Sequence, residues 1–309
     1  MPENRIYLPE GLRPHPPLSM ELLQAAMKNH TILEGMVLRC DAAHTLFVSL
    51  GELVGLIPQE EAVAPWINGA EREISLLSLV GKPVCFYVQS ISTGAKGAPV
   101  IMLSRRHVQE DAKSFFLQHW SSGSVITARV TRLETFGAFV DIGCGIISML
   151  PLKNISVSRI AHSNQRFQPG QKILAVISAM DPTLSRFYLT HKELLGTWME
   201  NATRFHPGDT VTGIVRSVQS YGCFVELTPN LCGLAERHTG IEEGDRVSVY
   251  LKGIHPESMK IKLQIIEKLP AEPFLPRLHY QITDGQMDRW CYSPANYERA
   301  AIETVFTPS

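Results

Sequence analysis

The 309-residue sequence predicts a mainly β protein: three tandem five-stranded barrels, joined by short α-helices and followed by a C-terminal extension. Three observations predict this fold class. One sequence pattern occurs three times, and each copy is flanked by short β-rich segments separated by Gly, Pro, Asn and Asp turns. The segments that connect the copies have apolar residues at helical spacing. The apolar fraction, 44%, is ordinary for a globular chain and sufficient for packed cores.

The repeated pattern consists of a ring residue, two light residues, Phe, Val, a polar residue and an aliphatic residue. It begins at His44, Phe136 and Tyr221. A β-rich run opened by glycine precedes each copy, and a turn, a short apolar element, a second such run and a final strand follow it. Each unit therefore offers about five short strands, the number found in a small barrel of the OB type. The expected barrels cover residues 31–106, 121–192 and 206–266.

The segments outside the barrels are expected to be mostly helical. Residues 1–30 form an N-terminal extension, in which a helix over residues 18–29 would begin after Ser19 as its N-cap. Residues 107–120 and 193–205 have apolar side chains three and four positions apart, which predicts amphipathic linker helices packed on a barrel. Residues 267–309 are rich in proline and then in aromatic residues, and they match no repeat.

Strand alternation predicts that the Phe of each repeat points away from the barrel core. The aliphatic residues of the pattern share one face, whereas Phe139 is in phase with Asp141, and Phe224 with Glu226. A ring on a wet face stacks on nucleic-acid bases and contributes about 1–3 kcal/mol per base. The alternative is that this Phe packs beneath a linker helix or another barrel. The rings expected to bind RNA are Phe136, Phe139, Tyr221 and Phe224.

Charge distinguishes the three repeats. The whole chain has a formal net charge of −1, so a nucleic-acid site depends on where the charges lie. Residues 121–192 carry a net charge of +5, and the other two units carry −1 each. Because phosphate neutralisation drives most nonspecific nucleic-acid affinity, the second repeat is the main RNA-binding candidate. The cations expected to contact RNA are Arg129, Arg132, Lys153, Arg159 and Arg166.

The second repeat resembles the S1 RNA-binding domain through residues 136–141 and 188–192, and the third repeat keeps Tyr221 and Phe224. The chain as a whole is similar to the bacterial ribosomal protein S1 family, in particular to S1-like proteins with three S1 domains of the clostridial type. This resemblance covers about residues 31–266. It implies OB-type barrels that bind single-stranded RNA, with mRNA and the small ribosomal subunit as partners in translation.

The resemblance also implies RNA contacts from the two motif aromatics, from nearby cations and from a histidine after a Gly-Leu turn. Pro58, Pro151 and Glu236 occupy that histidine position, so this contact is not expected in any repeat. His44 stands where the first ring of the motif is expected. The second repeat is therefore the most complete copy.

No sequence feature predicts an enzyme. The chain has no nucleophile–base signature, no phosphate-binding loop at Walker spacing and no Cys-x-x-Cys pair, so we expect no catalysis, metal or cofactor. Residues 1–16 lack the pattern of a signal peptide, and no apolar run reaches the ~20 residues of a membrane span, which predicts a cytoplasmic protein. We expect a monomer. The alternatives are a ribosome- or protein-docking scaffold and an RNA-binding regulator that is not a ribosomal component.

Overall fold

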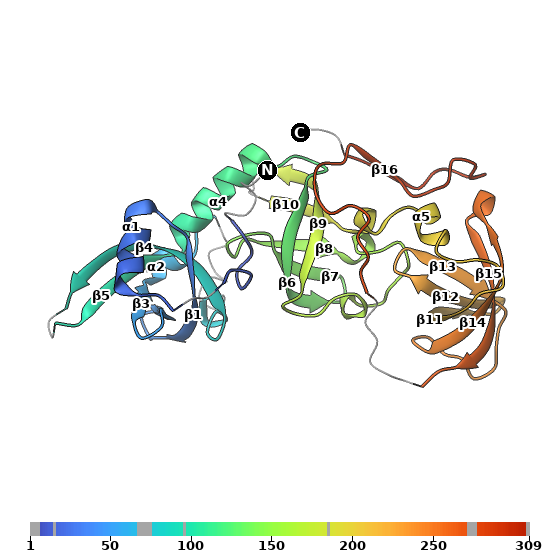
Figure 1. Ribbon diagram of the computed structural model, residues 1–309, viewed down its shortest axis with the longest axis horizontal. Helices are drawn as coiled ribbons and strands as arrows, with labels where there is room; N and C mark the ends of the chain where they lie inside the picture. Colours follow the sequence, from blue (N-terminus) through green and yellow to red (C-terminus); the bar gives the residue numbers. More distant parts are fainter. Residues whose placement is uncertain are drawn as a thin grey trace.

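The computed structural model describes residues 7–14, 17–66, 76–94, 97–183, 186–270 and 277–306. Two closed β-barrels and, between them, a five-stranded sheet follow one another in chain order and form a row (Figure 1); we call the three units the first, second and third barrel. The predicted mainly β fold class with three five-stranded units joined by short helices is confirmed.

The first barrel is closed, with strand order β1-β2-β3-β5-β4, and the parallel pairing of β3 with β5 completes the ring. Its core consists of aliphatic side chains at alternate strand positions, such as Leu46 and Val48, both fully buried. Its elements are α1 (Met20–Asn29), β1 (Leu33–Cys40), β2 (Leu46–Ser49), β3 (Val54–Ile57), α2 (Gln59–Ala62), β4 (Pro83–Thr93) and β5 (Pro99–Ser104).

The second unit is a five-stranded sheet with order β10-β9-β6-β7-β8, and β8 and β10 are its two edges. The hydroxyl of Ser148 on one edge donates to the carbonyl of Phe187 on the other. A side-chain hydrogen bond thus connects the two edge strands at the place where parallel strand pairing closes the other two barrels. Its strands are β6 (Val125–Glu134), β7 (Gly137–Asp141), β8 (Ile147–Pro151), β9 (Lys172–Asp181) and β10 (Arg186–Thr190).

The third barrel is closed in the same order as the first. Its core contains Val215, Val225 and Leu251, all fully buried. Its strands are β11 (Thr210–Gln219), β12 (Gly222–Thr228), β13 (Leu231–Ala235), β14 (Arg246–His255) and β15 (Lys260–Lys268). Two short strands of the C-terminal extension pair beyond it, β16 (Arg289–Cys291) and β17 (Glu303–Val305).

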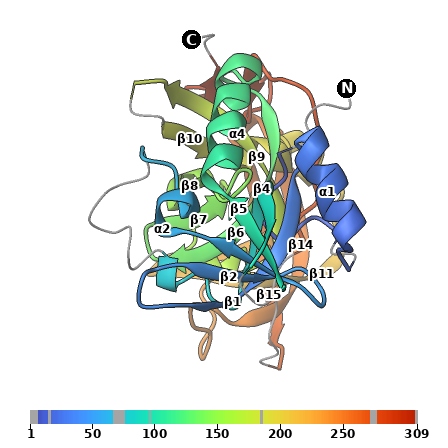
Figure 2. The same cartoon turned by 90° about the vertical axis from the view of Figure 1, so that its left-hand side faces the viewer.

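The helix that precedes each barrel in the sequence packs against that barrel. The predicted leading helix is confirmed as α1, and the Ser19 hydroxyl caps it by accepting from the Leu22 amide at 3.3 Å. The predicted helix after the first barrel is α4 (Arg106–His119), which buries Val108 and Phe116 in the core of the second barrel. Figure 2 views the row from the end of the first barrel and shows α1 and α4 at separate places on the periphery of that barrel.

The helix expected over residues 193–205 is not continuous. A 3₁₀ turn, η4 (Lys192–Leu195), comes first, and the α-helix α5 (Trp198–Ala202) follows it. Gly196 separates the two with a φ of +85°, a left-handed conformation that interrupts a helix. Thr197 and Glu200 then form a capping box that starts α5. Apolar spacing alone does not reveal this break.

Residues 7–14, which we call the N-terminal strap, join the first two barrels. The Glu10 carboxylate accepts hydrogen bonds from Nε and Nη2 of Arg105, at 2.7 and 2.9 Å, in a nearly fully buried ion pair. The Glu10 amide donates to Asp141 at 2.7 Å, and the Gly11 amide donates to Glu34 at 2.7 Å. Burial raises the pKa of the Asp141 carboxyl to about 7 and that of Glu34 to about 7. The strap therefore covers the end of β7 at Asp141.

Residues 277–306, which we call the C-terminal strap, rise between the second and third barrels in Figure 1 and continue along its upper edge with β16. The Gln281 amide donates to the Leu194 carbonyl at 2.8 Å, and the Met287 amide to Gly123 at 2.9 Å. Farther along, Trp290 and Tyr292 enter the core of the third barrel. The segment that matched no repeat is thus an inter-barrel connection.

Candidate nucleic-acid interface

The second barrel presents a pair of rings on its outer surface. Phe136 lies in the β6–β7 turn and Phe139 on β7, with ring centroids 6.0 Å apart and planes at 88°. Phe136 is 54% exposed. Gly137 stands between them because a Cβ there would approach the Leu150 carbonyl oxygen to 2.3 Å. The close passage of β8 therefore requires glycine and turns the two rings to the same side.

Neighbouring strands extend this surface on both sides of Phe139. Arg132 on β6 pairs with Phe139, which pairs with Met149 on β8. The Arg132 guanidinium lies 4.6 Å from the Phe139 ring centroid and forms a 3.0 Å ion pair with Glu134. On β10, Tyr188 is 47% exposed. In the other two barrels the residue at the equivalent position of the last strand pairs with the third strand and extends this row. Tyr188 was not among the predicted RNA contacts, although its alternation with the buried Phe187 and Leu189 indicates an outward ring.

The third barrel repeats the ring pair almost unchanged. Tyr221 and Phe224 have centroids 6.2 Å apart and planes at 89°, and Tyr221 is 65% exposed. Gly222 has the same role as the glycine of the second barrel, since a Cβ would meet the Ala235 carbonyl oxygen at 2.4 Å. The cross-strand row here is Ser217, Phe224, Leu234 and Lys262.

The first barrel carries one ring at this place. Phe47 pairs with Arg39 on β1 and Leu56 on β3, and the Arg39 guanidinium lies 3.3 Å above its centroid. His44 replaces the second ring and has a left-handed φ of +57°. A register shift precedes Arg39, as it precedes the corresponding residues of the other barrels. The three faces are thus built alike, and the first is the least aromatic.

The five cations predicted to contact RNA do not lie together. Arg132 flanks the ring pair of the second barrel, and Lys153 is exposed in the 3₁₀ turn η2 (Leu152–Asn154) after β8. Arg159 is exposed but faces the third barrel. Arg129 is half-buried against the N-terminal strap, because its guanidinium donates to the Glu10 carbonyl at 3.0 Å.

The prediction that Arg166 contacts RNA is wrong: Arg166 is fully buried and cannot bind phosphate at the surface. Its guanidinium forms a 2.5 Å ion pair with Glu226 of the third barrel, and Arg216 binds the same carboxylate at 2.7 Å. Burial lowers the pKa of Arg166, while the Glu226 charge opposes that change. The neighbouring ring of Phe167 is also fully buried. Asp141 and Glu226, expected on a wet face, are buried because neighbouring segments cover them.

A groove of about 1110 Å³ lies between the second and third barrels. One wall comes from residues 157–161 of the second barrel. The other wall contains the ring pair Tyr221 and Phe224, with Lys260 and Lys262 of β15 beside it. The structure therefore places one of the two ring pairs inside a hollow that two barrels share.

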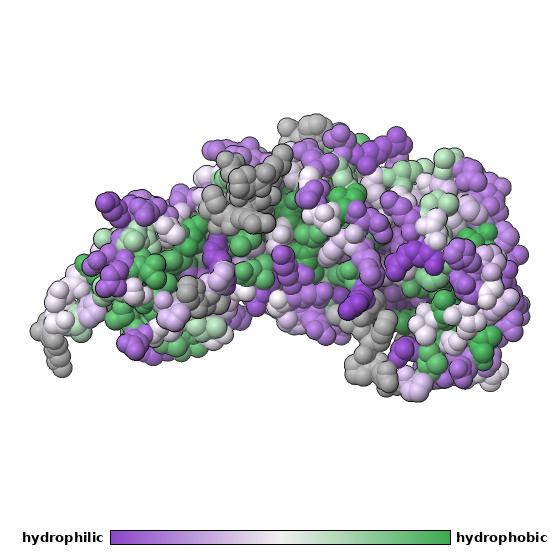
Figure 3. Space-filling view, in the orientation of Figure 1, coloured by the Kyte–Doolittle hydropathy of each residue, from purple (hydrophilic) through white to green (hydrophobic). Residues whose placement is uncertain are grey.

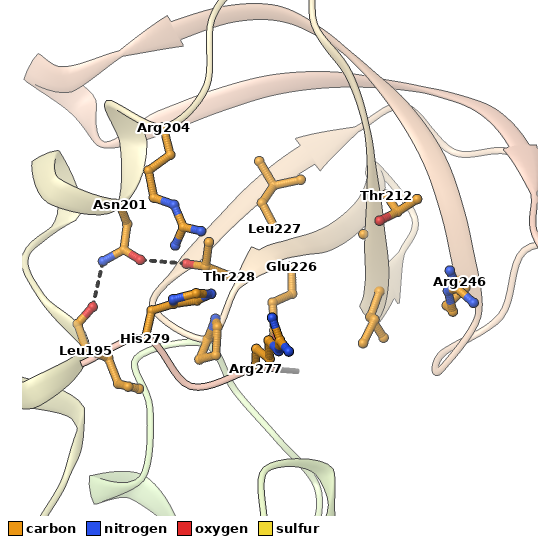
Figure 4. A pocket seen from close by; sticks show the side chains of 13 residues that line it. Leu195, Asn201, Arg204, Thr212, Glu226, Leu227, Thr228, Arg246, Arg277 and His279 are labelled. Atoms are coloured by element: carbon orange, nitrogen blue, oxygen red, sulfur yellow. Dashed lines mark hydrogen bonds between the residues drawn. The ribbon is translucent and has the colours of Figure 1, made fainter. Parts of the chain in front are cut away.

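A smaller cavity of about 180 Å³ lies farther along β11 and β12. Hydrophilic residues gather where the second barrel meets the third on the face seen in Figure 3. In Figure 4 the side chains of Arg204 and His279 point toward Thr228 within this cavity. Arg216 lines the groove and Glu226 lines the cavity, so their ion pair separates the two hollows.

Within the ranges that the structure describes, no group of three or more His, Cys, Asp or Glu side chains is placed to hold a metal ion. No helix in those ranges is long and apolar enough to cross a membrane.

Comparison with known proteins matches residues 121–192 to the model of the S1 RNA binding domain. The chain is 32% identical over 188 residues to the small ribosomal subunit protein bS1 of Staphylococcus aureus (strain COL), covering 56% of this chain and 48% of that protein. It is 32% identical over 183 residues to the bS1 homolog of Bacillus subtilis (strain 168), covering 54% and 48%. The chain spans about half the length of the curated relatives it matches.

A solved structure of a multidomain protein with nucleic acid binding domains, from Streptococcus pneumoniae, aligns with 77% of this chain and 73% of that one. Its TM-score is 0.25 and its sequence identity 15%. The domain match coincides with the barrel that carries Phe136, Phe139 and Arg132. Residues 121–192 therefore match the S1 RNA-binding domain, and the chain is similar to the two bS1 proteins over 188 and 183 residues.

Proposed function

We propose that this protein binds single-stranded RNA, in particular mRNA, through ring pairs on its second and third barrels. The observation that carries the proposal is the duplicated edge-to-face pair, at 6.0 Å and 88° in one barrel and 6.2 Å and 89° in the other. Each pair has one ring more than half exposed, which lets an unpaired base stack on it. A duplex hides its base faces, so the rings favour single strands.

The ring pairs are tested by titrating a labelled single-stranded RNA. Phe136→Ala/Phe139→Ala and Tyr221→Ala/Phe224→Ala should each weaken binding by about 1–3 kcal/mol per lost stacking contact, which is roughly 5-fold to 150-fold. The measurement is fluorescence anisotropy with circular dichroism to confirm folding.

Tyr250→Ala is the matched control. Tyr250 is 38% exposed on β14 of the third barrel and lines neither hollow. It should leave the affinity unchanged. Equal affinity of wild type and both folded ring-pair variants would rule out stacking as the binding mode.

We propose further that the workplace of this protein is the small ribosomal subunit in the cytoplasm. The named relatives are small ribosomal subunit proteins, and they support this assignment. Sedimentation of a cell extract with small subunits tests it. Recovery only in the ribosome-free fraction would favour an RNA-binding regulator.

The first barrel is best suited to docking on a protein. Its single outer ring is covered by Arg39. Large apolar side chains are exposed on and beside its strand β1, including Met36 (42%), Leu38 (53%) and Val80 (42%). Such a surface favours a protein partner over a polyanion.

We expect no catalytic role for the thiols of Cys85 and Cys232. Burial raises the pKa of Cys232 to about 12 and that of Cys85 well above its ordinary value. Thiols of this kind remain protonated and are poor nucleophiles.

A further inference from the structure

The ring pair of the third barrel does not face open solvent alone, because the second barrel supplies the opposite wall of its groove. Tyr221 and Phe224 line one side, and Val157, Arg159 and Ala161 line the other. The groove, at about 1110 Å³, is slightly larger than the ~300–1,000 Å³ typical of ligand pockets, so it has room for more than a single base.

The opposite wall is fixed to the third barrel before any ligand arrives. We call residues 156–166 the junction loop. The Ser158 amide donates to the Pro229 carbonyl at 3.1 Å, and the Val157 amide donates to the Asn230 side chain at 3.0 Å. At its far end Arg166 is locked to Glu226. A preformed groove costs little ordering free energy on binding.

The third barrel lacks the arginine that accompanies the ring in the other two barrels. Arg39 lies over Phe47 and Arg132 over Phe139, but the corresponding position is Ser217 in the third barrel. The junction loop therefore brings an arginine from outside: Arg159 is exposed and lines the same groove.

The charges around the groove suit a polyanion. Arg159, Lys260 and Lys262 are exposed, and among the described residues none of them has a carboxylate within 4.0 Å. Arg216 is already paired with Glu226, which lies outside the groove, and Glu243 is the acidic residue in the described lining. Three cations and two rings match the alternation of phosphates and bases in a single strand.

We propose that the groove is a composite RNA site, in which Arg159 of the second barrel binds a phosphate of the strand whose bases stack on Tyr221 and Phe224 of the third. This rests on the proposed function and deepens it: the third barrel binds RNA together with its neighbour. RNA in this site contacts both barrels at once.

A double-mutant cycle tests the composite site in the full chain. The variants are Arg159→Gln, Tyr221→Ala/Phe224→Ala and their combination, with anisotropy of a labelled single-stranded RNA as readout. Arg159→Gln should weaken binding roughly threefold to tenfold. Its effect should shrink when Tyr221 and Phe224 are absent, since the strand then no longer runs through the groove.

Two controls isolate the groove. Arg237→Gln removes an exposed arginine of the third barrel that lies outside the lining, and it should weaken binding less than Arg159→Gln. Combining Arg159→Gln with Phe136→Ala/Phe139→Ala should give additive effects, because that ring pair lies outside the groove.

The two levels of the hypothesis fail in different ways. If neither ring pair affects RNA affinity, the proposed function fails. The composite site is overturned in either of two cases in which Tyr221→Ala/Phe224→Ala still weakens binding. In the first, Arg159→Gln has no larger effect than Arg237→Gln. In the second, the effect of Arg159→Gln is additive with the loss of that ring pair, and RNA binding by the third barrel alone stands.

Discussion

Arg159 and Arg166 lie seven positions apart in one loop, yet they have opposite environments. Arg159 is exposed on the groove, whereas Arg166 is fully buried and shares the Glu226 carboxylate with Arg216. A desolvated guanidinium is stable only while its partner is present. Arg166 therefore has a structural role at the barrel junction, and Arg159 is free to serve a ligand.

This difference predicts separate effects on stability. Arg166→Met should lower the free energy of unfolding by up to about 3–5 kcal/mol, because Glu226 stays buried with Arg216 as its remaining arginine partner. Arg159→Gln, a surface change in the same loop, should alter it by about 0.5 kcal/mol or less. Urea unfolding followed by tryptophan fluorescence measures both. Equal stability of the two variants would contradict the structural role of Arg166.

At the scale of elements, the two straps decide which barrel faces remain open. The N-terminal strap covers the outer end of β7, where Asp141 accepts its amide, and leaves Phe139 on the same strand uncovered. The C-terminal strap attaches to the second barrel through Tyr280, whose hydroxyl lies 3.2 Å from His191 Nε2. Each strap brings together segments that are far apart in the sequence.

The C-terminal attachment should depend on pH. Burial lowers the pKa of His191 to about 4, so the folded protein binds fewer protons at this site than the unfolded chain, whose histidine has a pKa near 6.5. The neutral ring donates from Nδ1 to the Ile155 carbonyl at 2.6 Å. Its contribution to stability is present above about pH 6.5 and is lost as the pH falls toward 4, by at most about 1.4 kcal/mol per pH unit.

Chemical unfolding at a series of pH values measures this dependence. His191→Gln keeps a donor and an acceptor but does not titrate, so it should lose less stability than wild type between neutral pH and the acid range. Parallel pH profiles for the two proteins would show that His191 does not couple to the attachment of the strap.

At the scale of the whole molecule, the chain is nearly neutral, so the proposed binding of RNA depends on where a few cations lie. Arg129 and Arg166 are engaged internally. The cations near the two ring pairs and the groove are Arg132, Lys153, Arg159, Lys260 and Lys262. The net charge of the second barrel was therefore a poor guide to where those cations act.

Three to five phosphate contacts from this set predict a log–log salt slope of about −2 to −3.5 for a single strand. Titrations at several salt concentrations measure the slope. Phe136→Ala/Phe139→Ala should lower the affinity but leave the salt slope unchanged, since the rings carry no charge. Arg159→Gln should reduce its magnitude by about 0.7. A slope near zero would exclude phosphate contacts as a main term.

The sequence alone predicted the elements and the ring pairs. Alternation of side chains along a strand is a local property, so it identified Phe139 and Phe224 as outward residues and repeated that result in each unit. The glycines before these residues, and the apolar spacing of α4, were equally local signals. They located three β units and two aromatic faces.

Only the tertiary structure decided what covers those faces. Alternation shows that Asp141 and Glu226 point outward, but not that a strap lies over one and a junction loop over the other. The break at Gly196 and the burial of Arg166 likewise depend on contacts with distant segments. Local pattern sets the direction of a side chain, whereas its solvent exposure depends on long-range packing. For that reason the groove and its arginine became visible only in the folded chain.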